Sequence, residues 1–466
     1  MQVFSNKTFG KNVSIAIIAQ LISLAVSFLL NLIVPKYITI DQYSSWQAFS
    51  LYISYVGILH FGLLDGLMLR YSQYDYDELD KSRLRTQFLS LIVIISFFSL
   101  IGSCVSIMLS DGLAHKILLL VSIGIVTKNL FTFNSYTFQL TNRIGRYAAL
   151  TIIHRLLMGG MIICLILLKV QNFVWYCCAE LFADLIGFLI SSRWNKGLYF
   201  GKMLKIREIL KELRLNVSAG IKLLIANWAS MFILGSARML IQWHWNLITF
   251  GKVSFAFSLT NLFLSFITTI SIVFFPSIKR LNAASLPKVY IRTRRLLDVF
   301  LFSALLLYFP ISYIMGLWLP QYTESLDYLG ILLPMIVFSS KVMLLTNNYL
   351  KAYRKEGLML RINMISMLLA VLGFAVSAFV LDNLYALLLW VLVSVMIRSI
   401  ISESLVSDII KADFRYEYLV EVLMAIAFVL SSMTQNLLQG FLLYSAALLC
   451  YLCFQWKAKK NKHLCD

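Results

Sequence analysis

Charged residues are scarce in this 466-residue chain. Aspartate, glutamate, lysine and arginine make up 14% of it, whereas a soluble domain carries about 25%. Hydrophobic residues account for 60%. Apolar runs long enough to cross a bilayer core, which takes about 20 residues, recur along the whole chain. These features exclude an ordinary soluble fold and predict an all-α polytopic membrane protein.

Motifs that would indicate catalysis are also missing. The chain contains no P-loop, no H-E-x-x-H and no G-x-S-x-G sequence, so ATP-driven transport and hydrolysis have no support. We therefore predict that the protein is not an enzyme and needs no cofactor and no metal ion. His60 and His154 each lie alone in an apolar run, where a packed or hydrogen-bonded core histidine is expected rather than a proton relay.

Fourteen apolar segments qualify as candidate membrane spans. Pro310 and Pro334 fall inside the ninth and tenth of them and are expected to kink them. The last two spans are joined only by the short stretch SMTQN, which fits a tight hairpin turn. The segments are residues 13–34, 46–68, 87–109, 117–140, 147–168, 173–191, 219–243, 254–275, 297–318, 328–349, 362–380, 385–401, 419–435 and 438–455.

Lysine and arginine are unevenly distributed among the loops. If the N-terminus is inside, the loops on that side hold 31 of the 41 basic residues, and the opposite loops hold 4. Cytoplasmic loops carry such an excess, so we predict that both termini are cytoplasmic. The bias explains most of the net charge of +19 without nucleic acid as a partner. The basic loops are expected to contact anionic lipid headgroups.

A weak internal repeat suggests two lobes. PKYITIDQYSSWQAFSLY, which joins the first two spans, is similar to WHWNLITFGKVSFAFSLT, which joins the seventh and eighth spans 208 residues later. Six spans per half keep the same orientation, so a parallel repeat is predicted. The predicted parts are an N-terminal lobe (1–192), a linker (193–218), a C-terminal lobe (219–401), and a helix pair with a basic tail (402–466).

Several ionisable residues lie inside the predicted spans, where a charge at mid-bilayer costs about 3 kcal/mol. Glu180 and Asp184 are four residues apart on one helix face. Estimated depths match Lys128 with Glu180 and Arg155 with Asp184, so structural ion pairs are expected, with a direct role in a substrate pathway as the alternative. All in-span cations are candidates for lining a cationic cavity: Lys128, Arg155, Lys222, Arg238, Lys341 and Arg398.

The four cations of the second half have no acid in their own spans. Lys222 and Arg398 lie near inner span ends and can reach headgroups or, for Arg398, Glu403. Lys341 lies in the inner half of the tenth span. Arg238 lies toward the outer end of the seventh span and can also reach headgroups. A guanidinium is a planar donor fork that suits phosphate oxygens, so Arg238 is the leading candidate for binding an anionic substrate.

Four stretches of the chain are similar to stretches of a known family. They are NVSIAIIAQLISLAVSFLLNLIVPKYITIDQYSSWQAFSLY, HFGLLDGLMLRYS, GKVSFAFSLTNLF and FFPSIKRL. With these stretches and its pattern of spans, nearly the whole chain resembles the multidrug/oligosaccharidyl-lipid/polysaccharide exporter (MOP) superfamily. Within it, the chain looks like the bacterial O-antigen flippase (Wzx-type) branch. The resemblance implies a MATE-like fold of about 14 transmembrane helices, with two six-helix lobes, a C-terminal helix pair and alternating access.

The resemblance also implies a function. The protein would flip oligosaccharide linked to undecaprenyl diphosphate, an O-antigen or similar repeat unit, from the inner to the outer leaflet of the bacterial inner membrane. The diphosphate would pass through an aqueous cleft between lobes with cationic walls. Implied partners are this lipid, membrane lipids, and the polymerase and chain-length regulator of the same pathway. Coupling to an H⁺ or Na⁺ gradient stays open.

Two other functions are compatible with a many-span chain. A multidrug or cation antiporter has the same architecture, but such relatives use acids in the first span or its counterpart. Here the first span carries Asn31 and the seventh carries Arg238, which argues against a cationic drug. A polysaccharide polymerase or ligase resembles a many-span protein with one long outer loop, and the outer loops predicted here are short.

Overall fold

The computed structural model describes residues 6–109, 112–279, 285–353 and 355–462, and every regular element within them is a helix. The all-α prediction is therefore confirmed. Residues 280 and 281, at the end of the FFPSIKRL stretch, lie outside the described residues. The described peptide bonds contain no cis bond.

The chain forms two compact units, Met1–Ala229 (unit 1) and Ser230–Asp466 (unit 2). The division falls inside α9 (Ile206–His244), a helix of 39 residues. The stretch predicted as a linker, 193–218, contains the end of α7, the short α8 (Lys196–Tyr199) and the first turns of α9. Those turns continue into the seventh predicted span without a break. Hydropathy detects only the apolar part of such a helix, because its charged first turns lower the local average.

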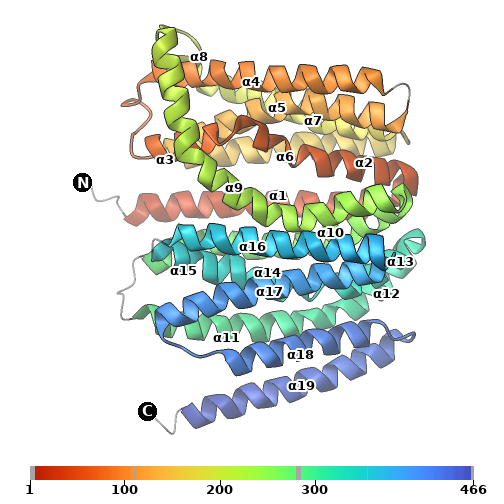
Figure 1. The fold of residues 1–466 in the computed structure, drawn as a ribbon. Coiled ribbons are helices and arrows are strands. Elements are labelled where there is room, and N and C mark those ends of the chain that lie inside the picture. Colours follow the sequence, from red (N-terminus) through yellow and green to blue (C-terminus); the bar gives the residue numbers. More distant parts are fainter. Residues whose placement is uncertain (1–5, 110–111, 280–284, 354, 463–466) are drawn as a thin grey trace. The chain divides into compact units, whose positions relative to one another are not determined.

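Helix α5 is the centre of unit 1. It packs against α4, α7, α2 and η1, and half of its most apolar window is buried, compared with 17% for α4. Figure 1 shows α4, α5 and α7 running alongside one another. Side-chain caps at Asp80 and Asn172 start α4 and α7. Before α9, the helices are α1 (Asn6–Tyr37), α2 (Ile40–Ile53), η1 (Val56–His60), α3 (Leu63–Tyr71), α4 (Lys81–Met108), α5 (Leu113–Leu140), α6 (Ile144–Leu167), α7 (Phe173–Trp194) and α8.

The second predicted span is bent. Its two parts, Ile40–His60 and Leu63–Tyr71, meet at 58°. At the bend, Gly62 has a φ of +78°, a conformation that glycine adopts without strain. A Cβ added at Gly62 would lie 2.7 Å from the carbonyl carbon of Gly220 in α9. Added Cβ atoms at Gly66 and Gly220 would also meet the backbone of the opposing helix. The glycines thus let α3 and α9 touch through their backbones.

Gly62→Ala should lower the melting temperature of the purified protein in detergent. The positive φ alone costs a residue with a side chain about 1–2 kcal/mol, and the added methyl group must also push α9 away. Gly57→Ala is the matched control, because a Cβ there meets no atom within 4 Å. Equal melting temperatures for the two variants would contradict the close backbone contact.

Unit 2 contains the rest of the chain. Helix α10 packs against α13, η5 and α14, α16 packs against α17, and α18 packs against α19. After α9, the helices are α10 (Leu247–Lys279), α11 (Leu286–Ala304), η3 (Leu305–Leu307), α12 (Tyr308–Trp318), η4 (Pro320–Tyr322), α13 (Thr323–Leu332), α14 (Met335–Ser340), η5 (Lys341–Thr346), α15 (Asn347–Ala352), α16 (Glu356–Ala375), η6 (Val376–Val380), α17 (Leu384–Ile410), α18 (Arg415–Ser432) and α19 (Leu437–Lys462).

Proline marks the bend in the tenth predicted span. The parts Pro320–Leu332 and Met335–Ala352 meet at 53°, and Pro334 lies between them, where its missing N–H interrupts the helix. Beyond this bend, η5 is a short π-helix. The kink expected at Pro334 is therefore present.

Each of the fourteen predicted spans falls on a described helix or on a run of consecutive helices. Among the residues that the structure describes, ten helices are long and apolar enough to cross a membrane, or up to twelve if each bent pair counts as one span. The two remaining candidates are α18, whose first two turns carry Arg415, Glu417 and Glu421, and α19, whose apolar part is Leu437–Cys453. This pair is anchored within unit 2, where the Tyr444 hydroxyl donates to the carbonyl of Phe302 at 2.8 Å.

Candidate functional site

Four ionisable residues inside the predicted spans of unit 1 form one group, the unit 1 cluster, made of Lys128, His154, Glu180 and Asp184. The Lys128 ammonium lies 3.4 Å from Glu180 and 3.5 Å from Asp184. Helix α6 contributes His154, whose Nε2 lies 2.9 Å from Asp184. Asp184 is fully buried. The Lys128–Glu180 pair predicted from depth is present, and His154 is a buried core residue, as expected, that also contacts Asp184.

The predicted pair between Arg155 and Asp184 is not formed. Among the described residues, Asp184 contacts Lys128 and His154, and Arg155 makes no ion pair. One residue along a helix turns the side chain by about 100°, so His154 faces α7 where Arg155 does not. Depth along the sequence matched the two residues, but it carries no information on that rotation.

Asp184→Asn should lower the amount of folded protein, and Arg155→Ala should not. Removing one partner of a buried ion pair costs about 3–5 kcal/mol, and the substitution leaves Lys128 with Glu180 alone. Arg155→Ala should change the free energy of unfolding by less than about 1 kcal/mol. Membrane-fraction blots and thermal unfolding measure both. A loss from Arg155→Ala as large as that from Asp184→Asn would contradict these contacts.

Unit 2 contains a larger group, the five-residue network of Arg294, Asp298, Lys341, Glu403 and Glu421. Arg294 lies 3.1 Å from Glu403 and 3.2 Å from Asp298, and it also contacts Glu421. Lys341 lies 3.0 Å from Glu403 and 4.0 Å from Asp298, and it contacts Glu421 as well. The side chains of all five residues are at most 5% exposed.

The network corrects the prediction for Lys341. This lysine is enclosed by carboxylates in the core of unit 2 and does not line a cationic cavity. Sequence reasoning missed the network partly because Arg294 and Glu403 fell just outside the predicted spans, although α11 and α17 extend past them. Asp298 and Glu421 fell inside predicted spans, but neither span contains a basic residue that would have suggested a pair. A usable signal was present, since Arg294 and Asp298 are four residues apart, the spacing of a helical ion pair.

The other predicted cations of the second half, Lys222, Arg238 and Arg398, make no ion pair with the five-residue network. Arg238 is half-buried on α9, with its Nε 3.3 Å from the Ser254 hydroxyl and its guanidinium 5.7 Å from the ring centre of Phe250; neither of these partners is charged. Arg398 on α17 makes no ion pair within the described part of the chain, and its buried Nε has no hydrogen-bond acceptor there. Lys222 is exposed on α9. The contact with Glu403 considered for Arg398 is not made, because Arg294 and Lys341 occupy that carboxylate.

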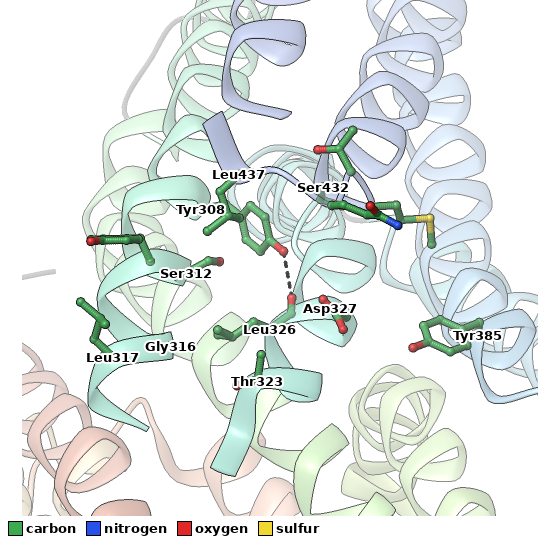
Figure 2. A pocket seen from close by; sticks show the side chains of 14 residues that line it. Tyr308, Ser312, Gly316, Leu317, Thr323, Leu326, Asp327, Tyr385, Ser432 and Leu437 are labelled. Carbon is green, nitrogen blue, oxygen red and sulfur yellow. Dashed lines mark hydrogen bonds between the residues drawn. The ribbon is translucent and has the colours of Figure 1, made fainter. Parts of the chain in front are cut away.

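A pocket of about 710 Å³ opens in unit 2 where α12, α13, the start of α17 and the α18–α19 turn meet (Figure 2). Its wall carries hydroxyl groups, aromatic rings and one carboxylate, Asp327. The Tyr308 hydroxyl donates to the carbonyl of Leu326 at 3.0 Å. None of the six predicted cations lines it. Rings beside hydroxyl groups suit a sugar, which offers C–H faces and many hydroxyls.

No family model matches the chain, and no curated protein matches it by sequence. Solved structures do match. The lipid II flippase MurJ, in an inward closed conformation, is 14% identical with a TM-score of 0.68, over 96% of this chain and 99% of its own. An outward-facing MATE multidrug resistance transporter of the MOP superfamily is 14% identical with a TM-score of 0.58, over 86% and 96%. The chain therefore shares its overall fold with MurJ and with the MATE transporter.

A third similar structure is a MOP superfamily transporter from Pyrococcus furiosus. The polarity of its binding pocket is reversed, which suggests a different function for that transporter. It is 14% identical to this chain with a TM-score of 0.52, over 90% of this chain and 96% of its own. The fold that the resemblance in the sequence implies is thus confirmed. The narrower assignment to the O-antigen flippase branch stays a prediction.

Proposed function

We propose that the protein is a flippase that moves an oligosaccharide linked to a polyprenyl diphosphate, such as an O-antigen repeat unit, across the bacterial inner membrane by alternating access. The observation that carries this proposal is the match to the lipid II flippase along 96% of the chain. The match to the MATE transporter covers 86% of this chain. Helices α18 and α19 hold 18 and 26 residues. Together they make up about a tenth of the chain, which is close to the difference between the two coverages.

The basic side chains suit the diphosphate part of such a lipid. Arg238 is half-buried and contacts a hydroxyl and a ring, and Arg398 keeps a buried Nε without an acceptor among the described residues. A guanidinium can donate two parallel hydrogen bonds to phosphate oxygens. Each such charge-assisted hydrogen bond is worth about 1.5–3 kcal/mol. The two arginines would therefore lower the barrier for moving a diphosphate through a region of low dielectric constant.

The sugar and the tail have candidate surfaces in unit 2. The 710 Å³ pocket offers rings and hydroxyls for the sugar part. A groove of about 310 Å³, lined by α10, α11, η3, α12, α13 and α14, is almost wholly apolar and includes Phe263, Phe266 and Phe300. An apolar polyprenyl chain gains about 0.8 kcal/mol for each CH₂ group removed from water, but bulk lipid offers the same gain, so the groove would guide the tail without holding it.

A multidrug or cation antiporter is the second candidate, because the MATE transporters share the fold. A cationic cargo would require accessible carboxylates. In the structure, Glu180, Asp184, Glu403 and Glu421 all lie against lysine, arginine or histidine side chains. Asn31 of the first span donates to the backbone carbonyl of Ser27. These contacts favour an anionic cargo, and an antiporter would have to use Asp327, the exposed carboxylate in the wall of the 710 Å³ pocket.

Complementation tests the proposal. Expression in strains that each lack one polysaccharide flippase should restore surface polymer in one of them. Everted vesicles from the same cells should show no uptake of fluorescent cations above the empty-vector control. Dye uptake without restored polymer would support the antiporter instead. We also propose that the polymerase and the chain-length regulator of the same pathway are partners of the protein. Both termini would lie in the cytoplasm.

A further inference from the structure

The five-residue network has an imbalance of charge. Asp298, Glu403 and Glu421 are three carboxyl groups, and Arg294 and Lys341 are two cations. With all five groups ionised, the network would carry one net negative charge. Its side chains are at most 5% exposed, so water cannot offset that charge. A buried group that lacks a counter-charge is expected to neutralise itself by taking up a proton.

Asp298 is the member that is least well satisfied. Its side chain is 1% exposed, and neither carboxylate oxygen accepts a hydrogen bond from any described residue. Arg294 and Lys341 lie 3.2 Å and 4.0 Å from it. By contrast, Glu403 accepts hydrogen bonds from Arg294 and Lys341 at 3.0–3.3 Å, and Glu421 accepts from the same two residues.

We propose that the five-residue network is a proton-binding site and that, if the protein is the flippase proposed above, this proton couples transport to a pH gradient. In the bound state, one carboxylate oxygen forms an O–H bond with a proton taken from water, and the network becomes neutral. In the released state, the proton returns to water and one negative charge remains. A conformational change that admits water to Asp298 would favour release.

The structure favours a proton over a metal cation. Within the described ranges, no group of three or more carboxylates, histidines or cysteines has the arrangement of a metal site. Arg294 and Lys341 lie between the carboxylates and would repel another cation. A proton needs neither space nor several ligands.

The position of the network suits a coupling role. Its members come from α11, η5, α17 and α18, so the network joins the helix pair at the end of the chain to the rest of unit 2. Lys341 opens the π-helix η5, and such π-helical turns occur frequently at functional sites. A change in the charge of the network would therefore alter the interaction among four helices.

Other titratable groups surround the network and must be considered in any pH dependence. The Tyr290 hydroxyl lies 3.4 Å from Glu403, and tyrosine hydroxyls on α18 and α19 lie within electrostatic range of the carboxylates. Because tyrosine stays neutral near pH 7, the carboxyl groups are the ones that exchange the proton. The neighbouring groups are Tyr290 and Arg294 on α11, Lys341 on η5, Glu403 on α17, Tyr418 and Glu421 on α18, and Tyr451 on α19.

Infrared spectroscopy of the purified protein tests proton binding without any transport. At neutral pH, the wild type should show a carboxylic acid C=O band that shifts in D₂O and is lost in Asp298→Asn. That variant leaves two carboxylates with two cations, so no proton is needed, whichever carboxyl group held it. Asp408→Asn, which alters an exposed carboxylate on α17, should keep the band. A wild-type spectrum identical to that of Asp298→Asn would overturn the proposal.

Transport then separates this inference from the proposed function. In proteoliposomes, the wild-type flipping rate should respond to a pH gradient by up to about tenfold per pH unit, the limit for one proton. The rate of Asp298→Asn should respond by less than about twofold. A wild type that shows the band but flips no lipid would contradict the flippase and leave the proton site standing. A wild type that flips lipid with the same pH response as Asp298→Asn would overturn the coupling.

Discussion

Lys341→Met should destabilise the protein by about 3–5 kcal/mol, the cost of removing one partner from a buried ion pair. The variant leaves three buried carboxyl groups with Arg294 as their one cation within the network. Because 1 kcal/mol is a large part of the stability of most proteins, we expect little folded protein in the membrane. Fluorescence-detected size exclusion and thermal unfolding measure this loss.

Two comparisons make this prediction specific to the network. Lys222→Met removes an exposed lysine and should change stability by less than about 0.5 kcal/mol. The double variant Lys341→Met/Glu421→Gln should be less destabilised than the sum of the single variants, since residues in one network couple by about 0.5–3 kcal/mol. Lys341→Met with wild-type stability, or strict additivity in the cycle, would show that the contacts around Lys341 contribute little.

Arg238→Ala and Arg398→Ala should each slow transport about 10- to 100-fold while leaving the amount of protein in the membrane nearly unchanged. This range corresponds to one lost charge-assisted hydrogen bond of about 1.5–3 kcal/mol to a phosphate oxygen. Arg238→Lys should restore part of the rate, because an ammonium keeps the charge and loses the planar fork. Surface polymer in a complemented flippase-null strain provides the measurement.

Lys116→Ala is the control for the loss of a positive charge. This lysine is exposed in the first turn of α5, and its removal should leave polymer at the wild-type level. Normal polymer from Arg238→Ala would remove Arg238 from the mechanism. Equal losses from Arg238→Ala and Lys116→Ala would point to overall charge instead of a specific contact.

The helices were predictable because an apolar run of membrane length has few alternatives to a helix. The bend at Pro334 was predictable from the missing N–H. The bend at Gly62 was not, because it depends on Gly220, which lies 158 positions later in the sequence. Helix ends were harder as well: α9 begins at Ile206 and α11 at Leu286, well before the apolar stretches on which the prediction relied.

The charged groups were only partly predictable, for a related reason. Depth along a helix can be counted from the sequence, and it matched Lys128 with Glu180. Rotation about the helix axis is set by packing. Because of that rotation, His154 contacts Asp184 and Arg155 does not. The network around Lys341 joins residues 294 to 421 across four helices, and single-span reasoning treats each of those residues as unpaired.

The proposed function is tested most directly by reconstituting the purified protein into liposomes with a fluorescent polyprenyl diphosphate oligosaccharide on one leaflet. Wild-type protein should expose the lipid on the opposite leaflet faster than protein-free liposomes do, and Arg238→Ala should slow that exposure at least about tenfold. Folded wild-type protein that leaves the lipid in place but takes up a cationic dye would contradict the flippase.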